Sequence, residues 1–182
     1  MRACAYVVSP TGRSGTALMD LAKGLGFDAV VPYQGVAAAE QQTTRTPLLF
    51  FLCAATPEMR SLKAVADAIR FFPSPGIRFS PLIYFDESPS LEVIRQCIAM
   101  GFDDVITLPF TRERVEERLL RQVDRPQVYF ETPSYFGPDR RDRLESEPVH
   151  SLRGTGGQFR RLEIIRNPLR GVHVLRDDVH LN

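Results

Sequence analysis

Apolar residues along the first 123 positions fall into two kinds of run. Four runs are short and continuously apolar, which predicts buried strands at residues 3–8, 27–31, 48–54 and 81–85. The most apolar of them reads LLFFLCA, and it predicts a central strand that is covered on both faces. A fifth strand is predicted at residues 105–107, because branched residues favour strands and the nearby Pro109 cannot continue a strand ladder.

Between these runs, apolar residues recur every three or four positions, which is typical of helices with one buried face. Helices are predicted at about residues 17–25, 36–42, 57–69, 89–98 and 111–123. Thr56-Pro57, Ser88-Pro89 and Thr111 are suited to begin a helix, through a hydroxyl cap or a proline in the first turn. Five strands that alternate with five helices predict an α/β fold, with a parallel sheet and helices on both of its faces.

Residues 101–110 read GFDDVITLPF and combine an acidic turn, a strand, a proline bend and the start of a capped helix. This run resembles the last strand and bend of the receiver domains of two-component response regulators, whose usual form is G-x-D-D-y-[IV]-x-K-P-F. The resemblance covers residues 1–123 and implies a receiver-like domain there. It also implies a flavodoxin-like fold, with five parallel strands in the order 2-1-3-4-5.

The resemblance places the residues for phosphorylation at the carboxyl ends of the strands. Two acids after the first strand hold Mg²⁺, an aspartate in the third strand accepts the phosphoryl group, and a hydroxyl and a lysine bind its oxygens. The matching positions here are Ser9, Cys53, Asp86 and Leu108. Cysteine is a poor ligand for Mg²⁺, and an acid at position 86 would repel a phosphoryl group. We therefore expect a degenerate pocket with no metal, no cofactor and no catalytic activity.

Three other interpretations of this region remain open. Cys53 precedes a predicted helix start and could be a redox or nucleophilic thiol, although a buried structural cysteine is the simpler interpretation. The loop at residues 11–16 contains two glycines before a helix and could bind an anion, although it matches neither common phosphate-binding motif. Asp103 and Asp104 suggest a metal ligand pair, but a pair of acids in a turn is the stronger interpretation, since the receiver family has acids there without a metal.

After residue 123 the composition changes. Prolines, glycines and arginines become frequent, so residues 124–182 are predicted to be an extended irregular tail, partly disordered or ordered by a partner. Within it, YFGPDRR resembles a motif that follows receiver-like domains in some bacterial proteins. Aromatic anchors and forked arginines favour partner binding through Tyr135, Phe136, Asp139, Arg140 and Arg141. The alternative is that this segment folds back onto its own domain. Residues 162–165 and 172–175 are apolar enough for a hairpin, or for addition to the edge of a partner's sheet.

Composition narrows the function classes. The 182 residues carry a net charge of +1, so no strong field for nucleic acid or for an anionic membrane is expected. No apolar run is long enough to span a bilayer and no signal peptide is recognisable, so a cytoplasmic location is expected. The three cysteines are widely spaced and each lies among apolar residues, which predicts reduced, buried thiols.

The sequence thus predicts a phosphorylation-independent interaction module of bacterial signal transduction. By the resemblance, it would bind a protein partner, or form a dimer, through the fourth helix, fifth strand and fifth helix at residues 91–123. The alternative is a small-ligand sensor that uses the vacated pocket for a nucleotide or another anion.

Overall fold

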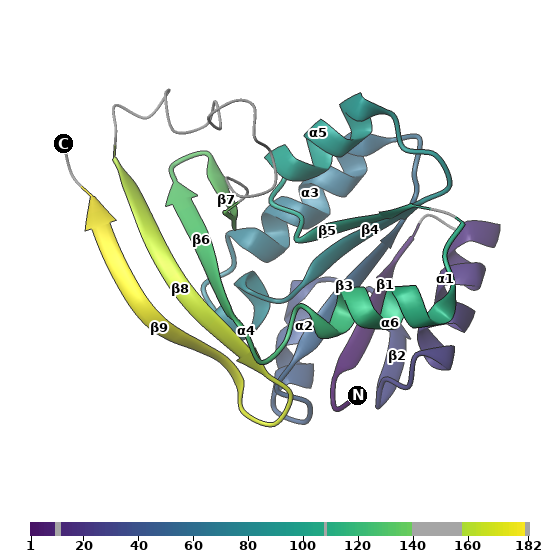
Figure 1. Ribbon diagram of the computed structural model, residues 1–182, viewed down its shortest axis with the longest axis horizontal. Coiled ribbons are helices and arrows are strands. Elements are labelled where there is room, and N and C mark those ends of the chain that lie inside the picture. Colours follow the sequence, from purple (N-terminus) through teal and green to yellow (C-terminus); the bar gives the residue numbers. More distant parts are fainter. Residues whose placement is uncertain (10–11, 108, 140–157, 181–182) are drawn as a thin grey trace.

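The computed structural model describes residues 1–9, 12–107, 109–139 and 158–180 (Figure 1). Its amino-terminal part contains a parallel sheet of five strands in the order β2-β1-β3-β4-β5. The strands are β1 (Cys4–Val8), β2 (Ala29–Pro32), β3 (Leu49–Ala54), β4 (Leu82–Asp86) and β5 (Asp104–Thr107). The predicted fold class and strand order are confirmed.

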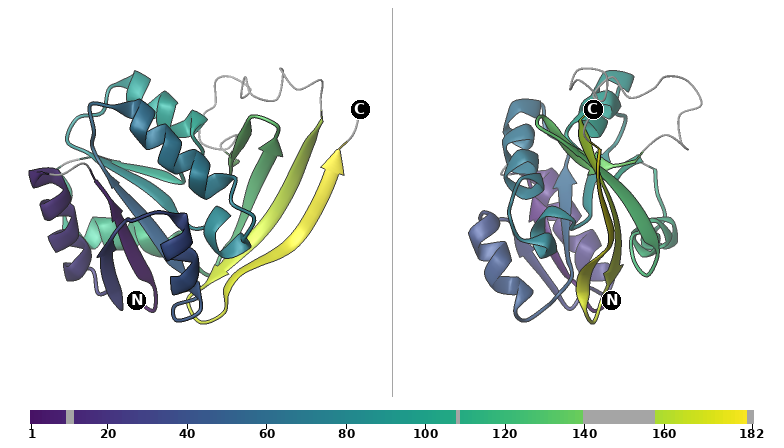
Figure 2. Two further views of the ribbon diagram at one scale, coloured as in Figure 1. Left: turned by 180° about the vertical axis from the view of Figure 1, so that it is seen from behind. Right: turned by 90° about the vertical axis from the view of Figure 1, so that its left-hand side faces the viewer.

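Helices cover both faces of this sheet, as Figure 2 shows. One face packs against α1 (Arg13–Gly24) and α6 (Arg112–Leu120), and the other against α2 (Val36–Thr43), α3 (Met59–Arg70) and α5 (Leu91–Ala99). All six residues of β3 are buried, because successive side chains enter the two cores in turn. Among the described residues, no helix is long and apolar enough to cross a membrane.

The helix starts follow the predicted signals with small shifts. The Thr111 hydroxyl accepts the backbone N–H of Arg114 at 3.3 Å and caps α6, as predicted. The cap of α5 is Ser90 rather than Ser88, and α3 begins after Glu58, two residues later than predicted. A further short helix, α4 (Pro75–Arg78), lies between α3 and β4, where no helix was predicted.

The carboxyl-terminal part differs from the predicted extended tail. Its described residues form β6 (Pro126–Thr132), β7 (Tyr135–Pro138), β8 (Phe159–Asn167) and β9 (Gly171–His180), an antiparallel sheet in the order β7-β6-β8-β9. The hairpin prediction is confirmed by β8 and β9, whose turn is held by Asn167 through its side-chain oxygen. The frequent prolines and arginines favoured the prediction of an irregular tail over that of a sheet. In β8, charged residues alternate with the inward Leu162 and Ile164.

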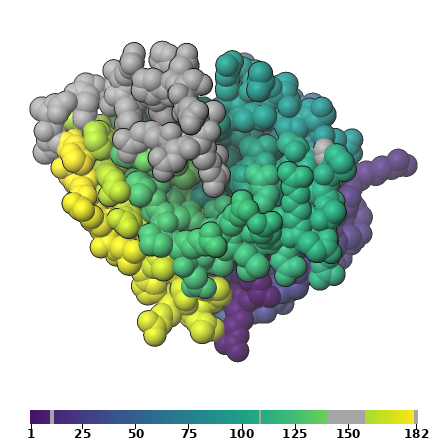
Figure 3. All heavy atoms as spheres, viewed as in Figure 1, coloured from purple at the N-terminus to yellow at the C-terminus, as the bar shows by residue number. Residues whose placement is uncertain are grey.

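The second sheet packs against the end of the first sheet at which β4 and β5 begin. In Figure 1 it lies at the left, and the arrowheads of β3 and β4 point away from it. Figure 3 shows all atoms in the same view, with the yellow residues of β9 along the left side. Phe79, which precedes β4, packs against Tyr129, Phe136, Leu162 and Ile164. The centroids of the Phe79 and Tyr129 rings are 5.3 Å apart, at nearly perpendicular planes. The segment that precedes β4 therefore shares an apolar core with the second sheet, and this core joins residues on both sides of position 123.

Candidate functional site

The ends of β1, β3 and β4 meet at the carboxyl edge of the parallel sheet. In this register Val8 lies opposite Cys53, and Cys53 lies opposite Tyr84. Ser9 follows β1, and Asp86 is the last residue of β4. The structure therefore brings Ser9, Cys53 and Asp86 to adjacent strand ends, as predicted from the sequence. Leu108, the fourth predicted position, lies outside the described residues.

Cys53 faces a helix-covered core rather than the open edge. Its side chain is fully buried in the cluster formed with α2, α3 and α5. Burial and the nearby Cys97 raise the pKa of the Cys53 thiol far above its ordinary value, and Arg70 offsets this only in part. A thiol in such surroundings stays protonated at neutral pH and is a poor nucleophile. The geometry favours the structural interpretation of Cys53 over the redox interpretation.

Asp86 is held in the turn that leads to α5. Its carboxylate accepts hydrogen bonds from the Tyr84 hydroxyl at 3.2 Å and from the backbone N–H of Ser88 at 3.1 Å. Burial and the charge of Asp86 raise the pKa of the Tyr84 hydroxyl, which stays protonated and donates. Glu87, the next residue, is exposed.

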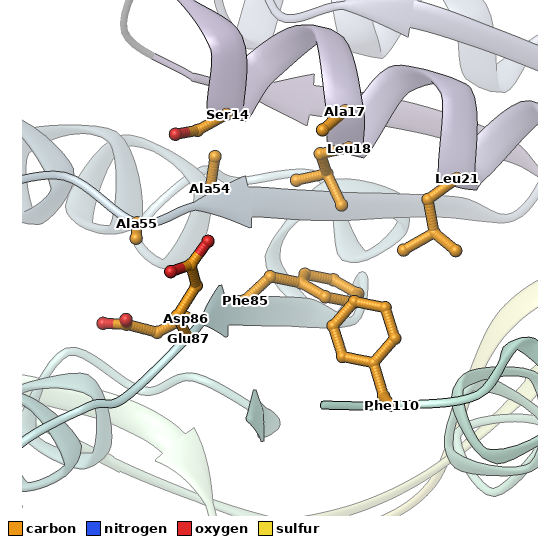
Figure 4. A pocket seen from close by; sticks show the side chains of 10 residues that line it. All are labelled: Ser14, Ala17, Leu18, Leu21, Ala54, Ala55, Phe85, Asp86, Glu87 and Phe110. Atoms are coloured by element: carbon orange, nitrogen blue, oxygen red, sulfur yellow. The ribbon is translucent and has the colours of Figure 1, made fainter. Parts of the chain in front are cut away.

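A cavity of about 280 Å³ opens beside Asp86, between α1 and the residues that follow β3, β4 and β5 (Figure 4). The phenyl rings of Phe85 and Phe110 lie at one end, and the carboxylates of Asp86 and Glu87 lie at the other. Among the described residues, its lining comprises Ser14, Ala17, Leu18, Leu21, Ala54, Ala55, Phe85, Asp86, Glu87 and Phe110. The only charged groups in this set are the two acids, so the cavity does not suit an anion.

The loop before α1 gives the anion hypothesis little support. Thr11 lies outside the described residues, and residues 13–16 form the first turn of α1. The backbone N–H of Thr16 already donates to the carbonyl of Gly12 at 3.3 Å. The described part of this loop therefore forms an ordinary helix start.

Asp103 and Asp104 each pair with arginine. Asp103 bonds to Arg70 at 2.6 Å and to Arg166 at 2.7 Å, and Asp104 bonds to the Nε of Arg118 at 2.7 Å. In the described ranges, no three His, Cys, Asp or Glu residues gather in a way that could hold a metal ion. The carboxylates of this acidic turn therefore serve as ion-pair partners.

The bonds of Asp103 form a buried polar network between the two parts of the chain. Arg70 and Arg166 are buried, and Arg166 and Asp103 both bond to the Tyr129 hydroxyl. Burial alone would raise the pKa of the Asp103 carboxyl, but Arg166 and Arg70 outweigh that effect and lower it to about 2. Sequence reasoning missed this network. The available signal was that Arg166 continues the inward series of Leu162 and Ile164 in β8.

The aromatic residues of the YFGPDRR segment are buried within the protein. Phe136 is 1% exposed, and the guanidinium of Arg78 lies 4.0 Å from the centre of its ring. Tyr135 is 8% exposed, and its hydroxyl donates to the carbonyl of Pro138 at 3.3 Å. The interpretation of Tyr135 and Phe136 as partner anchors is therefore replaced by the alternative that this segment packs against its own domain.

Of the remaining candidate residues in that segment, the structure describes Asp139. Asp139 follows β7, and its backbone N–H donates to the carbonyl of Val128 at 2.7 Å. Arg140 and Arg141 lie outside the described residues, so their predicted role in partner binding stays a prediction.

No protein family model matches the chain, and no curated protein matches it. Solved structures do match. The receiver domain of a sensor histidine kinase from Pseudomonas aeruginosa, whose structure holds a magnesium ion in its active-site cleft, aligns with a TM-score of 0.50 and 18% identity, over 65% of this chain and 94% of that domain.

Two further solved structures align at similar levels. A CheY-like protein from Pseudomonas aeruginosa aligns with a TM-score of 0.49 and 13% identity, over 64% of this chain and 98% of that one. A signal receiver domain of a histidine kinase from Clostridium thermocellum aligns with a TM-score of 0.48 and 13% identity, over 65% and 94% of the two chains. Of the three, the sensor-kinase receiver domain with a TM-score of 0.50 supports the fold, and at 18% identity it shows the fold and not the function.

Proposed function

We propose that this receiver-fold protein is a phosphorylation-independent interaction module of bacterial signal transduction, located in the cytoplasm and without catalytic activity of its own. The observation that carries the proposal is the set of residues at the carboxyl edge. Ser9, Cys53 and Asp86 stand there, and the Cys53 thiol is buried in a core. Mg²⁺ needs several oxygen ligands, and a transferring phosphoryl group needs cationic charge beside it. This set supplies a single carboxylate and no cation.

The proposed binding face comprises α5, β5 and α6. Two large apolar side chains are exposed on these helices, Leu91 at 74% and Leu120 at 51%. Arg118 holds α6 against β5 through its bonds to the Asp104 carboxylate and to the carbonyl of Val105. A surface that carries exposed apolar residues suits a protein partner or a second copy of the chain.

The edge of β9 is a second candidate surface for the same function. Val174, Leu175 and Val179 are 43%, 55% and 63% exposed there. An edge strand that carries exposed apolar residues can pair with a strand of another chain.

The first test is incubation of the full chain with acetyl phosphate and Mg²⁺, followed by intact-mass spectrometry, beside a receiver domain that autophosphorylates under the same conditions. We expect no added phosphoryl group, which would otherwise appear as about 80 Da of extra mass and as added negative charge. Stoichiometric phosphorylation of an acidic residue would contradict the proposal.

The second test is sedimentation equilibrium of the full chain at tens of micromolar, the range of weak association. We expect a dimer that Leu91→Lys with Leu120→Lys converts to monomer, while Val174→Lys with Val179→Lys leaves it intact. The reverse pattern would move the interface to β9. A monomer throughout would exclude self-association in this range and leave only a different protein partner.

A further inference from the structure

The cavity beside Asp86 takes no part in the proposed interaction function, and it has the features of a ligand site. We propose that it binds a small organic cation, an ammonium group attached to a short alkyl or aryl body. This inference goes beyond the proposed function, which needs no ligand. The charge of the ligand is also opposite to that of the nucleotide or anion considered from the sequence.

The walls of the cavity suit an apolar body. Ser14, Ala17, Leu18 and Leu21 recur at helical spacing and present one face of α1 to it. Residues at or just after the ends of the strands form the opposite wall. There the ring centroids of Phe85 and Phe110 are 6.0 Å apart, with an angle of 73° between the ring planes.

Small side chains create the space between these walls. Ala17 lies on α1, whereas Ala54 and Ala55 lie at the end of β3. In Figure 4 their methyl groups and the two phenyl rings border the same opening. An aryl or alkyl group placed there would contact apolar atoms on both sides and lose its hydration shell, which is the main favourable term for such a ligand.

The acidic residues at one end of the cavity favour a ligand with a positive charge. Asp86 and Glu87 lie together at one end of the cavity, and the ten lining residues include no arginine, lysine or histidine. Two bonded donors, Tyr84 and the Ser88 backbone, hold the Asp86 carboxylate in place. An ammonium group at this end would gain two attractive charges, whereas a phosphate or carboxylate would meet two repulsive ones.

The size of the cavity limits the ligand. Drug-sized ligands occupy cavities of about 300–1,000 Å³, so the volume of about 280 Å³ fits a molecule of about ten non-hydrogen atoms. Phenethylammonium has this size and charge, and 3-phenylpropionate offers a similar body with the opposite charge. With so few atoms, the expected Kd for phenethylammonium is roughly 0.1–1 mM.

The test is a titration of the full, ¹⁵N-labelled chain with each compound, followed by NMR. We expect phenethylammonium to shift the amide signals of Leu18, Ala54 and Phe85 in a saturable way, and 3-phenylpropionate to leave them unchanged. Equal binding of the two compounds, or no saturable shift by phenethylammonium up to about 10 mM, roughly tenfold above the highest expected Kd, would overturn the proposal.

Two variants locate the site. Ala17 is exposed, so Ala17→Phe should fill the space between the two walls of the cavity without disturbing a core. It should weaken binding more than tenfold. Ala37→Phe is its matched control on the exposed face of α2, across the sheet, and should bind as the wild type does. Binding that survives Ala17→Phe would place the ligand elsewhere and would overturn the assignment.

A double variant without the two negative charges tests the acidic end of the cavity. Asp86→Asn with Glu87→Gln should weaken phenethylammonium binding about five- to tenfold, because partly exposed ion pairs contribute modestly. Glu40→Gln with Asp67→Asn removes the same net charge from α2 and α3 and should leave binding unchanged. An equal loss in both double variants would show that only the overall charge matters and would contradict the site. The titrations do not depend on phosphorylation or on self-association. The proposal of a cation site can therefore fail without affecting the proposed function.

Discussion

Asp103 binds residues that are far apart in the chain. Its two carboxylate oxygens bond to Arg70, 33 positions earlier, and to Arg166, 63 positions later. Both arginines also donate to backbone carbonyls, Arg70 to Gly101, Arg78 and Ser80, and Arg166 to Phe79. Two buried cations therefore depend on one buried anion for charge compensation.

We predict that Asp103→Asn lowers the free energy of unfolding by about 3–5 kcal/mol, because removal of one member leaves buried charge without a partner. Urea denaturation measures this. Asp67→Asn is the control, since it breaks the exposed pair with Lys63 and should cost less than about 1 kcal/mol. Similar losses in the two variants would contradict the central place of Asp103.

The same carboxyl group predicts a dependence of stability on pH. Its pKa is about 2 in the folded protein, against an ordinary value of 3.8. A carboxyl whose pKa is lowered by folding stabilises the protein while it is ionised, so this contribution is present above about pH 4 and is lost as the pH falls towards 2. Urea midpoints between pH 5 and pH 2 should therefore fall less steeply for Asp103→Asn than for the wild type. Parallel slopes would show that other acids cause the loss.

Single residues were predictable where their role is local. Thr111 caps α6 through its hydroxyl, as predicted, and Ser9, Cys53 and Asp86 lie at or next to the ends of adjacent strands. The role of Asp103 was not predictable in this way, because its partner Arg166 is distant in sequence and lies in a segment that composition described as a tail.

At the scale of elements, the close approach of β7 to the turn before β5 decides how the sheets meet. Gly101 has φ +79, a left-handed conformation that favours glycine. A Cβ built on Gly101 would lie 3.2 Å from the carbonyl carbon of Phe136 and closer still to its oxygen. The glycine of the receiver-like run thus has a second role here, since it lets β7 approach.

We predict that Gly101→Ala destabilises the protein by at least about 2 kcal/mol, since left-handed strain and overpacking each cost about 1–3 kcal/mol. Gly24→Ala is the matched control, because nothing lies within 4 Å of a Cβ added there and its φ is not positive. Thermal unfolding of the two variants measures the difference. A Gly101→Ala protein as stable as the control would show that β7 can move away without cost.

Strands buried on two faces and helices with one apolar stripe were readable from the sequence. The strands β6–β9 were harder, because β9 is mostly exposed and carries charged residues in its middle. Their pairing joins residues that are far apart in the sequence. Tyr129 of β6, for example, lies opposite Leu162 of β8. Local composition carries no information about such distant partners, so the segment was predicted to be irregular.

For the whole molecule, the boundary predicted at residue 123 cuts through a shared core and a shared charge network. Truncation there would expose Phe79 and leave Arg70 and Asp103 open to water. We expect a protein of residues 1–123 to lose cooperative unfolding, or to unfold at a clearly lower urea concentration than the full chain, as followed by circular dichroism. The same midpoint for both would show that the receiver-like part is independent of the second sheet.

The edges of the second sheet limit how many molecules it could join. β7 has four residues, ends at Pro138 and lies against Gly101, so it offers a strand of another molecule little length to pair with. β9 has ten residues, and among the described strands only β8 pairs with it. Among the described strands, the second sheet thus offers one long edge to a strand of another molecule. Strand addition at β9 alone would therefore end at a closed pair, and by this edge alone the exposed valines and leucine of β9 could not seed an endless fibre.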